Sequence, residues 1–263
     1  MVKGLFVTGT DTEVGKTVIA AGLAGLFREK GLKVGVMKPI QTGAVKREGK
    51  LISQDLELMI KTSGIVEDVK LLNPYCLEPA VAPLVASQIT GVKIDIEKIL
   101  ASYRELKSRY DIVIVEGTGG ILVPIKDNYL MIDLIKDLDL PILIVAKPSL
   151  GTINHTLLTI KQAQSQGIRI FGVVINMFKE DEATIVEKTN PQIIQTLSKV
   201  PILAIIPYNP EINLEKGNPG NIINLLKENL KVDILVTIHR RDAEEQRKHG
   251  NKSGNRKNYW CSN

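Results

Sequence analysis

Cysteines and long apolar runs are both scarce in this sequence. The two cysteines, Cys76 and Cys261, are far apart and lack the spacing of a metal site, and no secretory signal is visible. We therefore expect a reduced, cytoplasmic protein. The longest apolar runs, 140–146 and 200–207, each contain proline and are too short to cross a bilayer, so the sequence predicts no transmembrane segment.

A surplus of positive charge is also missing from most of the chain. The formal net charge is +5 at pH 7, but residues 239–263 hold seven Lys or Arg against three Asp or Glu, which accounts for +4. The basic character therefore belongs to a polar tail without apolar periodicity, and this composition predicts a flexible extension. A solvated terminus explains the tail better than contact with nucleic acid or membrane, and we expect neither partner.

What the sequence does contain is a regular alternation of short apolar runs and amphipathic segments. With 263 residues, 44% of them hydrophobic, the chain can bury a sizeable α/β core. The alternation predicts a doubly wound, mostly parallel sheet flanked by helices and joined by right-handed crossovers. We expect a single domain over residues 1–230 and a C-terminal extension over 231–263. The expected strands lie at 2–7, 33–37, 110–116, 141–146, 171–176 and 202–206; the expected helices lie at 18–30, from about 53, 94–109, 129–138, 149–166 and 220–230; loops are expected at 44–50 and at 73–91, the latter leading to a short helix.

Residues 2–17, VKGLFVTGTDTEVGKT, place a strand, a turn and the start of a helix in the order of a P-loop. In such a loop, backbone N–H groups and the positive end of the helix hold phosphates, a lysine reaches the terminal phosphates and a hydroxyl ligates Mg²⁺. Lys16 and Thr17 fit the last two roles. The match has one departure, because Thr10 stands where glycine is usual and Gly9 is one residue early.

Three charged residues stand near the ends of predicted elements. Lys38 follows the strand at 33–37, on the edge where open α/β sheets bind ligands, although a solvated lysine is an equal alternative. Asp55 falls in the first turn of a helix, where a lone acid commonly does no more than interact with the helix dipole. Glu116 ends a buried strand and opens the glycine-rich turn EGTGG. P-loop NTPases place an acid near Mg²⁺ at this point, which favours a functional role.

Further polar residues lie at later strand ends. Ser149 and Thr152 are plausible caps of the helix that follows, and the free N–H groups there could hold a carboxylate, with simple capping as the alternative. Asn176 and the segment 207–209 end two strands on the edge that carries the P-loop, where a nucleotide base could be read. His155 has no second His or Cys at ligand spacing, so we interpret it as structural.

Four motifs resemble those of the dethiobiotin synthetase family: GTDTEVGKT at 9–17, KPIQTG at 38–43, VEGTGG at 115–120 and LGTINH at 150–155. The resemblance extends from residue 1 to about 230. Thr42 replaces the commoner serine of the second motif and keeps its hydroxyl. The resemblance implies an ATP- and Mg²⁺-dependent ligase of biotin biosynthesis. It would close 7,8-diaminopelargonate and CO₂ into dethiobiotin, through a carbamate and a carbamic–phosphoric anhydride, with release of ADP and phosphate.

The resemblance also implies roles for individual residues and a homodimer with its active sites at the interface. Lys38 and Lys16 would be catalytic. Mg²⁺ would be held by Thr17, Asp55 and Glu116. ATP would be bound by Glu13, Val14, Gly15, Lys16, Thr17, Val18, Asp55, Glu116, Gly117, Thr118, Gly119, Asn176, Pro207, Tyr208 and Asn209. The substrate would be bound by Thr12, Thr42 and a segment that in the family comes from the partner subunit and binds the carboxylate, Leu150, Gly151, Thr152, Ile153 and Asn154.

Two other P-loop functions remain as alternatives. A chromosome-partition or division-site ATPase of the ParA or MinD kind would carry a signature lysine second in the P-loop, where this chain has Asp11. It would also carry an amphipathic membrane-binding tail, whereas residues 239–263 have no apolar face. An amide-forming synthetase of cobalamin synthesis would need a glutamine amidotransferase domain, and the residues after 230 are too few to form one.

Overall fold

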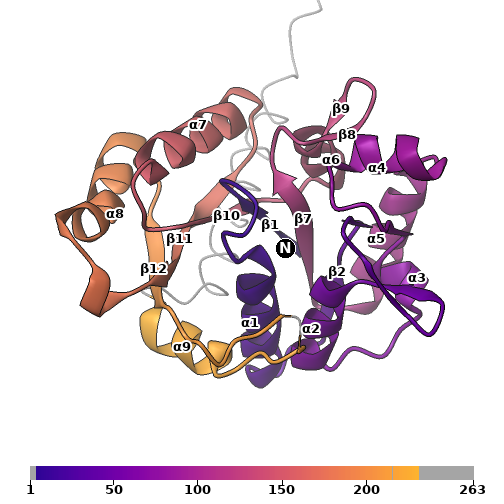
Figure 1. Ribbon diagram of the computed structural model, residues 1–263, viewed down its shortest axis with the longest axis horizontal. Coiled ribbons are helices and arrows are strands. Elements are labelled where there is room, and N and C mark those ends of the chain that lie inside the picture. The colour runs from indigo at the N-terminus through magenta and orange to yellow at the C-terminus, as the bar shows by residue number, and fades with distance from the viewer. Residues whose placement is uncertain (1–3, 215, 231–263) are drawn as a thin grey trace, which may run out of the picture.

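The computed structural model of the chain describes residues 4–214 and 216–230 (Figure 1). Its centre is a parallel sheet of six strands in the order β12-β11-β10-β1-β7-β2. β1 lies inside the sheet, with later strands added on both sides, so the strand order reverses beside it. Open α/β sheets bind ligands at such a reversal, beyond the carboxyl ends of the strands. The six strands are β1 (Gly4–Gly9), β2 (Val34–Met37), β7 (Ile112–Gly120), β10 (Ile142–Ala146), β11 (Ile170–Phe178) and β12 (Ile202–Pro207).

Helices cover both faces of this sheet. α1, α2 and α9 pack side by side on one face, and α5, α6, α7 and α8 lie over the other (Figure 1). The arrangement confirms the predicted doubly wound α/β fold in a single domain. The helices are α1 (Lys16–Glu29), α2 (Gln54–Ser63), α3 (Val69–Leu72), α4 (Pro83–Thr90), α5 (Ile96–Arg109), α6 (Met131–Leu138), α7 (Thr152–Ser165), α8 (Ile185–Ser198) and α9 (Ile222–Asn229), with a 3₁₀ turn at Glu180–Glu182.

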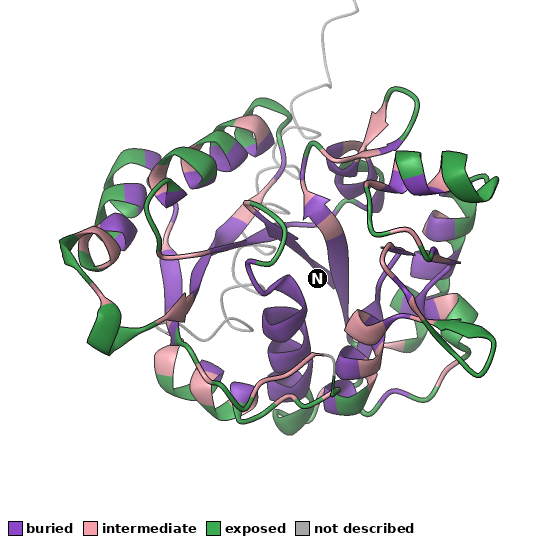
Figure 2. Ribbon diagram, viewed as in Figure 1, coloured by how far each residue is buried: buried purple, intermediate pink, exposed green. Residues whose placement is uncertain are grey.

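The hydrophobic core is continuous from the strands into α1. β1, β2 and β10 are buried along their whole length, as expected for parallel strands with helices on both faces (Figure 2). α1 is buried from Lys16 to Phe27 because α2 and α9 flank it. The helix that begins at the P-loop is therefore held in place by its neighbours, and it fixes the end of the loop that leads into it.

The strand register brings the predicted site residues level with one another. Met37 of β2 pairs with Val115 of β7, so Lys38 comes level with Glu116. Glu116 in turn pairs with Val7 of β1, shortly before the P-loop. The two candidate residues therefore lie on neighbouring strands at the edge that carries the phosphate-binding turn.

Several predicted boundaries were wrong. The expected loop at 44–50 contains most of a hairpin, β4 (Val45–Arg47) with β5 (Lys50–Ile52), whose turn residues Glu48 and Gly49 both have positive φ. Such a two-residue turn matches the twist of a hairpin. The expected loop at 73–91 contains β6 (Tyr75–Cys76), which pairs with β3 (Ile40–Gln41), before the expected short helix, α4.

The expected helix at 129–138 starts later than predicted. A second hairpin, β8 (Pro124–Lys126) with β9 (Tyr129–Leu130), takes up the first two residues of that range. Leu130 then serves as the N-cap residue, and its backbone N–H donates to the Asp133 carboxylate at 2.8 Å. The expected extension over 231–263 lies outside the described residues. Within the part of the chain that the structure describes, none of the helices is both long enough and apolar enough to cross a membrane.

Candidate active site

The turn between β1 and α1 is shaped by two residues in the left-handed backbone region, Glu13 at φ 53° and Gly15 at φ 87°. Gly15 is the N-cap residue of α1, and no side chain caps this helix end. A Cβ at Gly15 would lie 2.1 Å from Asn176 Nδ2, so glycine is required by space as well as by φ. This backbone leaves N–H groups available for an anion at the helix start.

Gly9 explains how the loop tolerates Thr10. A Cβ at Gly9 would lie 2.7 Å from Val14 Cγ2 and 2.9 Å from the Asp11 carbonyl oxygen. The loop therefore folds directly over Gly9, and the glycine that is one residue early allows this close approach. The turn therefore stays compact, although the glycine stands one residue earlier than in the usual P-loop spacing.

Lys16 lies across this turn, with its side chain buried. Its Nζ donates to the Asp11 carbonyl oxygen at 2.8 Å, and the residue is 7% exposed. Burial, and next the nearby charge of Lys38, lower the pKa of Lys16 to about 8. A lysine held this way gains an ionic partner when phosphate enters the loop.

Lys38 lies at the centre of a buried ion-pair cluster. Its Nζ is 2.7 Å from Asp55 Oδ2 and 2.9 Å from Glu116 Oε1, and it also donates to the Gly117 carbonyl oxygen at 3.2 Å. The Thr17 hydroxyl donates to the same Glu116 Oε1 at 2.8 Å. Residues from the P-loop helix, β7, α2 and the end of β2 thus converge on one point.

The pKa values of the two carboxyl groups in this cluster shift in opposite directions. Burial acts most strongly on Lys38 and would lower its pKa, but Asp55 and Glu116 together outweigh burial and the pKa is raised. Burial raises the pKa of Glu116 in spite of Lys38. Burial acts the same way on Asp55, yet Lys38 outweighs it and lowers the pKa of that carboxyl. The Asp55 side chain keeps 21% exposure against 1% for Glu116, which accounts for the difference.

The donor set of this cluster fits Mg²⁺. Glu116 Oε2 is buried and has no hydrogen-bond partner among the residues described. A buried carboxylate oxygen without a donor is costly, and it is the kind of hard ligand that Mg²⁺ takes. Across residues 4–214 and 216–230, no group of three or more His, Cys, Asp or Glu side chains could hold a metal. The residues here therefore fit a metal whose remaining ligands are phosphate oxygens and water molecules.

The predicted base-reading residues lie beside the P-loop at the ends of β11 and β12. Asn176 is buried, and its Nδ2 donates to the Val14 carbonyl oxygen at 3.0 Å. Tyr208 is half exposed, and its backbone N–H donates to Phe178 at 2.8 Å, which joins the two strand ends. The Asn209 side chain donates to Asn221 at the start of α9. Asn176 therefore contacts the phosphate-binding turn directly, whereas Tyr208 and Asn209 are bonded to the end of β11 and the start of α9.

The glycines after Glu116 are part of β7, so the predicted stop of this strand at Glu116 was wrong. A Cβ at Gly117 would lie 2.7 Å from the Phe6 ring, and a Cβ at Gly119 would lie 2.6 Å from Val123. The glycines therefore allow close packing within a continuing strand. The Thr118 hydroxyl donates to the Ile40 carbonyl oxygen at 2.5 Å, which fastens β7 to the segment after Lys38.

The segment 150–154 is not joined to this cluster. Leu150 is 85% exposed, and none of the hydrogen bonds or ion pairs among the described residues links the segment to Lys16, Lys38, Asp55 or Glu116. It follows β10, three strands from β2 in the sheet, which is roughly 14 Å at the usual strand spacing. The segment is thus not bonded to the cluster of the same chain, although β10, which precedes it, pairs with β1, the strand that leads into the P-loop.

The predicted capping at this segment was wrong. α7 starts after Gly151, which is in the left-handed region at φ 94°, and no side chain caps the helix. Ser149 contributes its carbonyl oxygen instead, which accepts from the Thr152 N–H at 3.1 Å. The other two predicted substrate residues are placed differently: Thr12 is exposed on the P-loop, and Thr42 is partly buried after β3.

Asn73 is a residue of the site that sequence reasoning missed. Its buried side chain donates to the Lys38 carbonyl oxygen at 2.6 Å and to the Tyr75 carbonyl oxygen at 2.9 Å. The Lys38 N–H donates to the Leu72 carbonyl oxygen at 2.9 Å. The backbone of Lys38 is therefore fixed at both polar atoms. In the sequence this residue is marked only by the Asn-Pro pair at 73–74, which is typical of the start of a loop and does not indicate a contact with Lys38.

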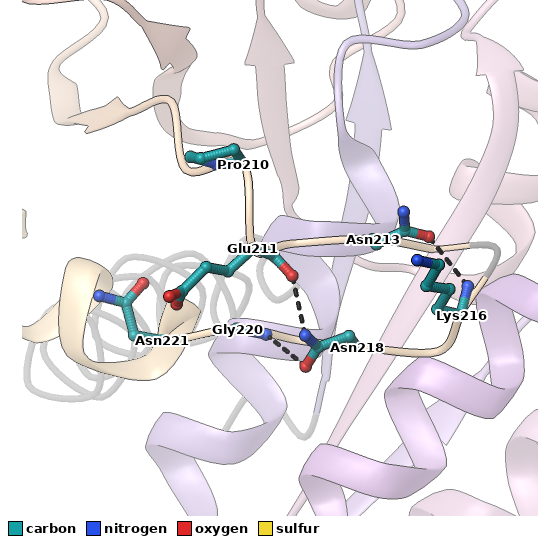
Figure 3. Close-up of a pocket in the computed structure, with 7 residues that line it drawn as sticks. All are labelled: Pro210, Glu211, Asn213, Lys216, Asn218, Gly220 and Asn221. Carbon is teal, nitrogen blue, oxygen red and sulfur yellow. Dashed lines mark hydrogen bonds between the residues drawn. The ribbon is translucent and has the colours of Figure 1, made fainter.

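A surface pocket in the segment after β12 is separate from this cluster (Figure 3). Its polar groups mainly hold the loop: Asn218 Nδ2 donates to the Glu211 carbonyl oxygen at 2.9 Å, and Gly220 N–H donates to Asn218 at 3.2 Å. None of the predicted site residues lines the pocket. Its lining consists of Pro210, Glu211, Asn213, Lys216, Asn218, Gly220 and Asn221.

Comparisons with known proteins agree with this site and fold. The family model described as an AAA domain matches residues 3–216. The ATP-dependent dethiobiotin synthetase of Thermodesulfovibrio yellowstonii is 42% identical over 245 residues, covering 90% of this chain and 100% of that protein. The protein of the same name from Bacillus subtilis strain 168 is 39% identical over 236 residues, covering 89% and 97% respectively.

Solved structures share the fold at lower identity. The MinD cell division protein of Aquifex aeolicus superposes with a TM-score of 0.55 at 19% identity, over 92% of this chain and 98% of that one. A ParA family ATPase from Chlorobium tepidum TLS gives 0.52 at 21% identity, over 86% and 92%. These likenesses confirm the P-loop NTPase type of fold and concern the fold alone. The likeness to the synthetases spans nearly the whole of both proteins, and the chain belongs to the ATP-dependent dethiobiotin synthetase family.

Proposed function

We propose that this protein is a cyclo-ligase of biotin biosynthesis that converts 7,8-diaminopelargonate, CO₂ and ATP into dethiobiotin, ADP and phosphate. The observation that carries the proposal is the buried cluster of Lys38, Asp55, Glu116 and Thr17 beside the P-loop. A family member needs a cation beside the terminal phosphate, and the burial of Lys38 in this cluster supports it as that cation.

The reaction requires the formation of two C–N bonds to one carbon. One amine of the substrate adds to CO₂ and loses a proton, which gives a carbamate. A carbamate oxygen then attacks the γ-phosphorus of ATP, ADP leaves, and a carbamic–phosphoric anhydride results. The second amine attacks the carbamoyl carbon and loses a proton, the phosphate leaves with the C–O electron pair, and the cyclic urea closes. Phosphoryl transfer asks little covalent chemistry of a protein, so positioning and charge neutralisation are its main contribution.

Two buried lysines supply the positive charge for these steps. Lys16 would exchange its contact with the Asp11 carbonyl oxygen for the β- and γ-phosphates. Lys38 would neutralise the carbamate and the transferring phosphoryl group together. Because the Lys38 ammonium is buried between two carboxylates, its charge persists at neutral pH.

Thr17, Asp55 and Glu116 would hold Mg²⁺, as the unpartnered Glu116 Oε2 supports. The metal would supply charge neutralisation of the phosphates. The nucleotide would be bound by the remaining residues of the turn, of β7 and of the strand ends: Glu13, Val14, Gly15, Val18, Gly117, Thr118, Gly119, Asn176, Pro207, Tyr208 and Asn209.

The substrate carboxylate would be bound by a second subunit. In the segment of Leu150, Gly151, Thr152, Ile153 and Asn154, the first two residues and the last are exposed, and no side chain caps the start of α7. No hydrogen bond or ion pair among the described residues joins the segment to the cluster of its own chain. A homodimer in which this segment serves the partner's active site accounts for both features. Thr12 and Thr42 would contact the rest of the substrate. We place the enzyme in the cytoplasm, acting on small molecules, without nucleic acid or membrane partners.

The assay that tests this function mixes purified protein with diaminopelargonate, bicarbonate, Mg²⁺ and ATP, and measures dethiobiotin and ADP by mass spectrometry. We expect one ADP for each dethiobiotin. ATP hydrolysis without product, stimulated by DNA or by vesicles, would instead support a switch of the MinD or ParA kind. An amide formed from a carboxylate substrate would support the cobalamin-pathway alternative.

A further inference from the structure

Gln41 and Ser53 form a buried link between the segment after Lys38 and the start of α2. The Ser53 hydroxyl donates to Gln41 Oε1 at 2.7 Å, and Gln41 Nε2 donates to the Thr42 carbonyl oxygen at 2.7 Å. Gln41 is 7% exposed and Ser53 is 5% exposed. The amide oxygen of Gln41 therefore joins the two chain segments, and its amide nitrogen bonds within its own segment, which fixes the orientation of the amide group.

The Gln41 end of this link is rigid. Gln41 ends β3, which pairs with β6, and its carbonyl oxygen accepts from the Leu77 N–H at 2.8 Å. The neighbouring Ile40 carbonyl oxygen accepts from Thr118 of β7. β3 is thus fastened to β7 of the central sheet and to β6, so it can act as an anchor.

The Ser53 end of the link sets where α2 begins. Ser53 is the N-cap residue of α2, and its Oγ accepts from the Leu56 N–H at 3.1 Å. Asp55 lies in the first turn, two residues after this cap, and reaches Lys38 Nζ at 2.7 Å. A shift of the first turn would move this carboxylate directly, because so few residues separate it from the cap.

We propose that Gln41 is a positioning residue that, through Ser53, holds the first turn of α2 so that Asp55 reaches Lys38 and the Mg²⁺ of the nucleotide. The inference rests on the proposed function, since it assigns Asp55 to the metal. Partners that orient a metal ligand typically change metal affinity by about 10- to 100-fold when they are removed. In this role Gln41 acts through Ser53 and is not itself a ligand of the nucleotide or the metal.

Two substitutions separate this link from ordinary helix capping. Gln41→Met keeps the side-chain length and removes both hydrogen bonds. Ser53→Gly removes the hydroxyl but introduces a residue that caps helices nearly as well. Asp95→Gly makes a comparable cap substitution on α5, which carries no site residue, and is the matched control.

The readout is ATP binding to the full chain by calorimetry, with and without Mg²⁺. Mg²⁺ is expected to strengthen ATP binding, and the quantity compared is the Mg²⁺ concentration that gives half of this strengthening. We expect Gln41→Met and Ser53→Gly each to raise that concentration about tenfold, while ATP binding without Mg²⁺ stays unchanged. The double variant should be no worse than the worse single variant, because both cut the same link. Ser53→Thr, which keeps the hydroxyl, should restore the wild-type requirement.

An unchanged Mg²⁺ requirement in both variants, each with a normal thermal transition, would overturn the proposal. So would an equal change in Asp95→Gly, since capping alone would then explain the effect, or independent effects that multiply in the double variant. The binding assay does not depend on product. A wild-type protein that binds Mg·ATP but makes no dethiobiotin would refute the proposed function while the positioning role is still measured.

Discussion

Lys38 and Glu116 meet through a single carboxylate oxygen. Lys38 Nζ lies 2.9 Å from Glu116 Oε1, which also accepts from Thr17, whereas Oε2 has no partner among the described residues. One oxygen thus holds two donors while the other stays available for a ligand. The relation depends on β2 and β7 being neighbours in register, so the sheet itself sets the distance between the two side chains.

Replacement of Lys38 should remove activity with little direct effect on ATP binding. In Lys38→Met the carbamate and the phosphoryl group lose their cation, so we expect product formation to fall at least about 100-fold. Fluorescence titration with ATP and the dethiobiotin assay check the two halves of this statement. Lys136→Met, at an exposed lysine on α6, is the control and should keep full activity. Turnover near wild type in Lys38→Met would remove Lys38 from the mechanism.

Replacement of Gly15 should damage the phosphate-binding turn beyond the cost of its backbone angle. Gly15 and Gly31 have nearly the same φ, 87° and 85°, but only at Gly15 would a Cβ collide with another side chain, that of Asn176. Alanine at either position costs about 1–2 kcal/mol for the left-handed backbone. Urea unfolding should show this loss in both variants, while calorimetry should show weaker ATP binding in Gly15→Ala alone. Equal ATP affinity in the two variants would contradict the role of the close contact.

The buried ammonium of Lys16 should make stability depend on pH in the absence of ligands. Burial and Lys38 lower its pKa from 10.5 to about 8, so between these values the unfolded state binds more protons at this side chain. The free energy of unfolding contributed by Lys16 therefore rises as pH rises through this window, and the penalty is fully present below pH 8. The 2.5-unit difference (10.5 − 8) corresponds to about 3 kcal/mol at most.

The measurement is urea unfolding with chelator and without nucleotide, from pH 7.5 to 10, for wild type and Lys16→Met. Other lysines and tyrosines also titrate in this range, so the quantity of interest is the difference between the two proteins. Wild type should gain stability relative to Lys16→Met as pH rises. If the difference in unfolding free energy between the two proteins stays constant with pH, burial does not lower the pKa of Lys16.

The meeting of Lys16, Lys38, Asp55 and Glu116 was predictable from sequence because parallel strands share their carboxyl edge. Each candidate stood at the end of a predicted strand or the start of a helix, and a parallel sheet brings these positions to one edge. Only the adjacency of β1, β7 and β2 was needed to bring Lys16, Glu116 and Lys38 close, not the order of the remaining strands. The role of Asp55 came from the family resemblance, because its position in a helix is equally explained by the helix dipole.

The features that were missed depend on backbone angles and on distant contacts. The start of α7 uses the positive φ of Gly151, so a rule that looks for Ser or Thr caps chose the wrong residues. Asn73 acts on Lys38, 35 residues away, and nothing local marks that contact. α8 was not predicted, although Thr184 and Glu187 form a capping box that signals its start.

If the segment 150–154 serves the partner's active site, two inactive variants should restore activity when mixed. Lys38→Met disables the site of its own chain, and Leu150→Asp, at an exposed position, places a negative charge where the substrate carboxylate would bind. In a mixed dimer, one site takes its Lys38 from the Leu150→Asp chain and its 150–154 segment from the Lys38→Met chain, so that site is intact. Random exchange makes half of the dimers mixed, and the expected recovery is about a quarter of wild-type turnover.

The exchange is made by unfolding and refolding the two variants together, and dethiobiotin is measured before and after. Each variant refolded alone is the control and should stay inactive, which separates complementation from partial recovery of either chain. No recovery in the mixture, with dimers present by light scattering, would mean that the segment acts within its own chain. In that case Lys38 and Leu150 would have to approach each other inside one subunit, across the strands that now separate β2 from β10.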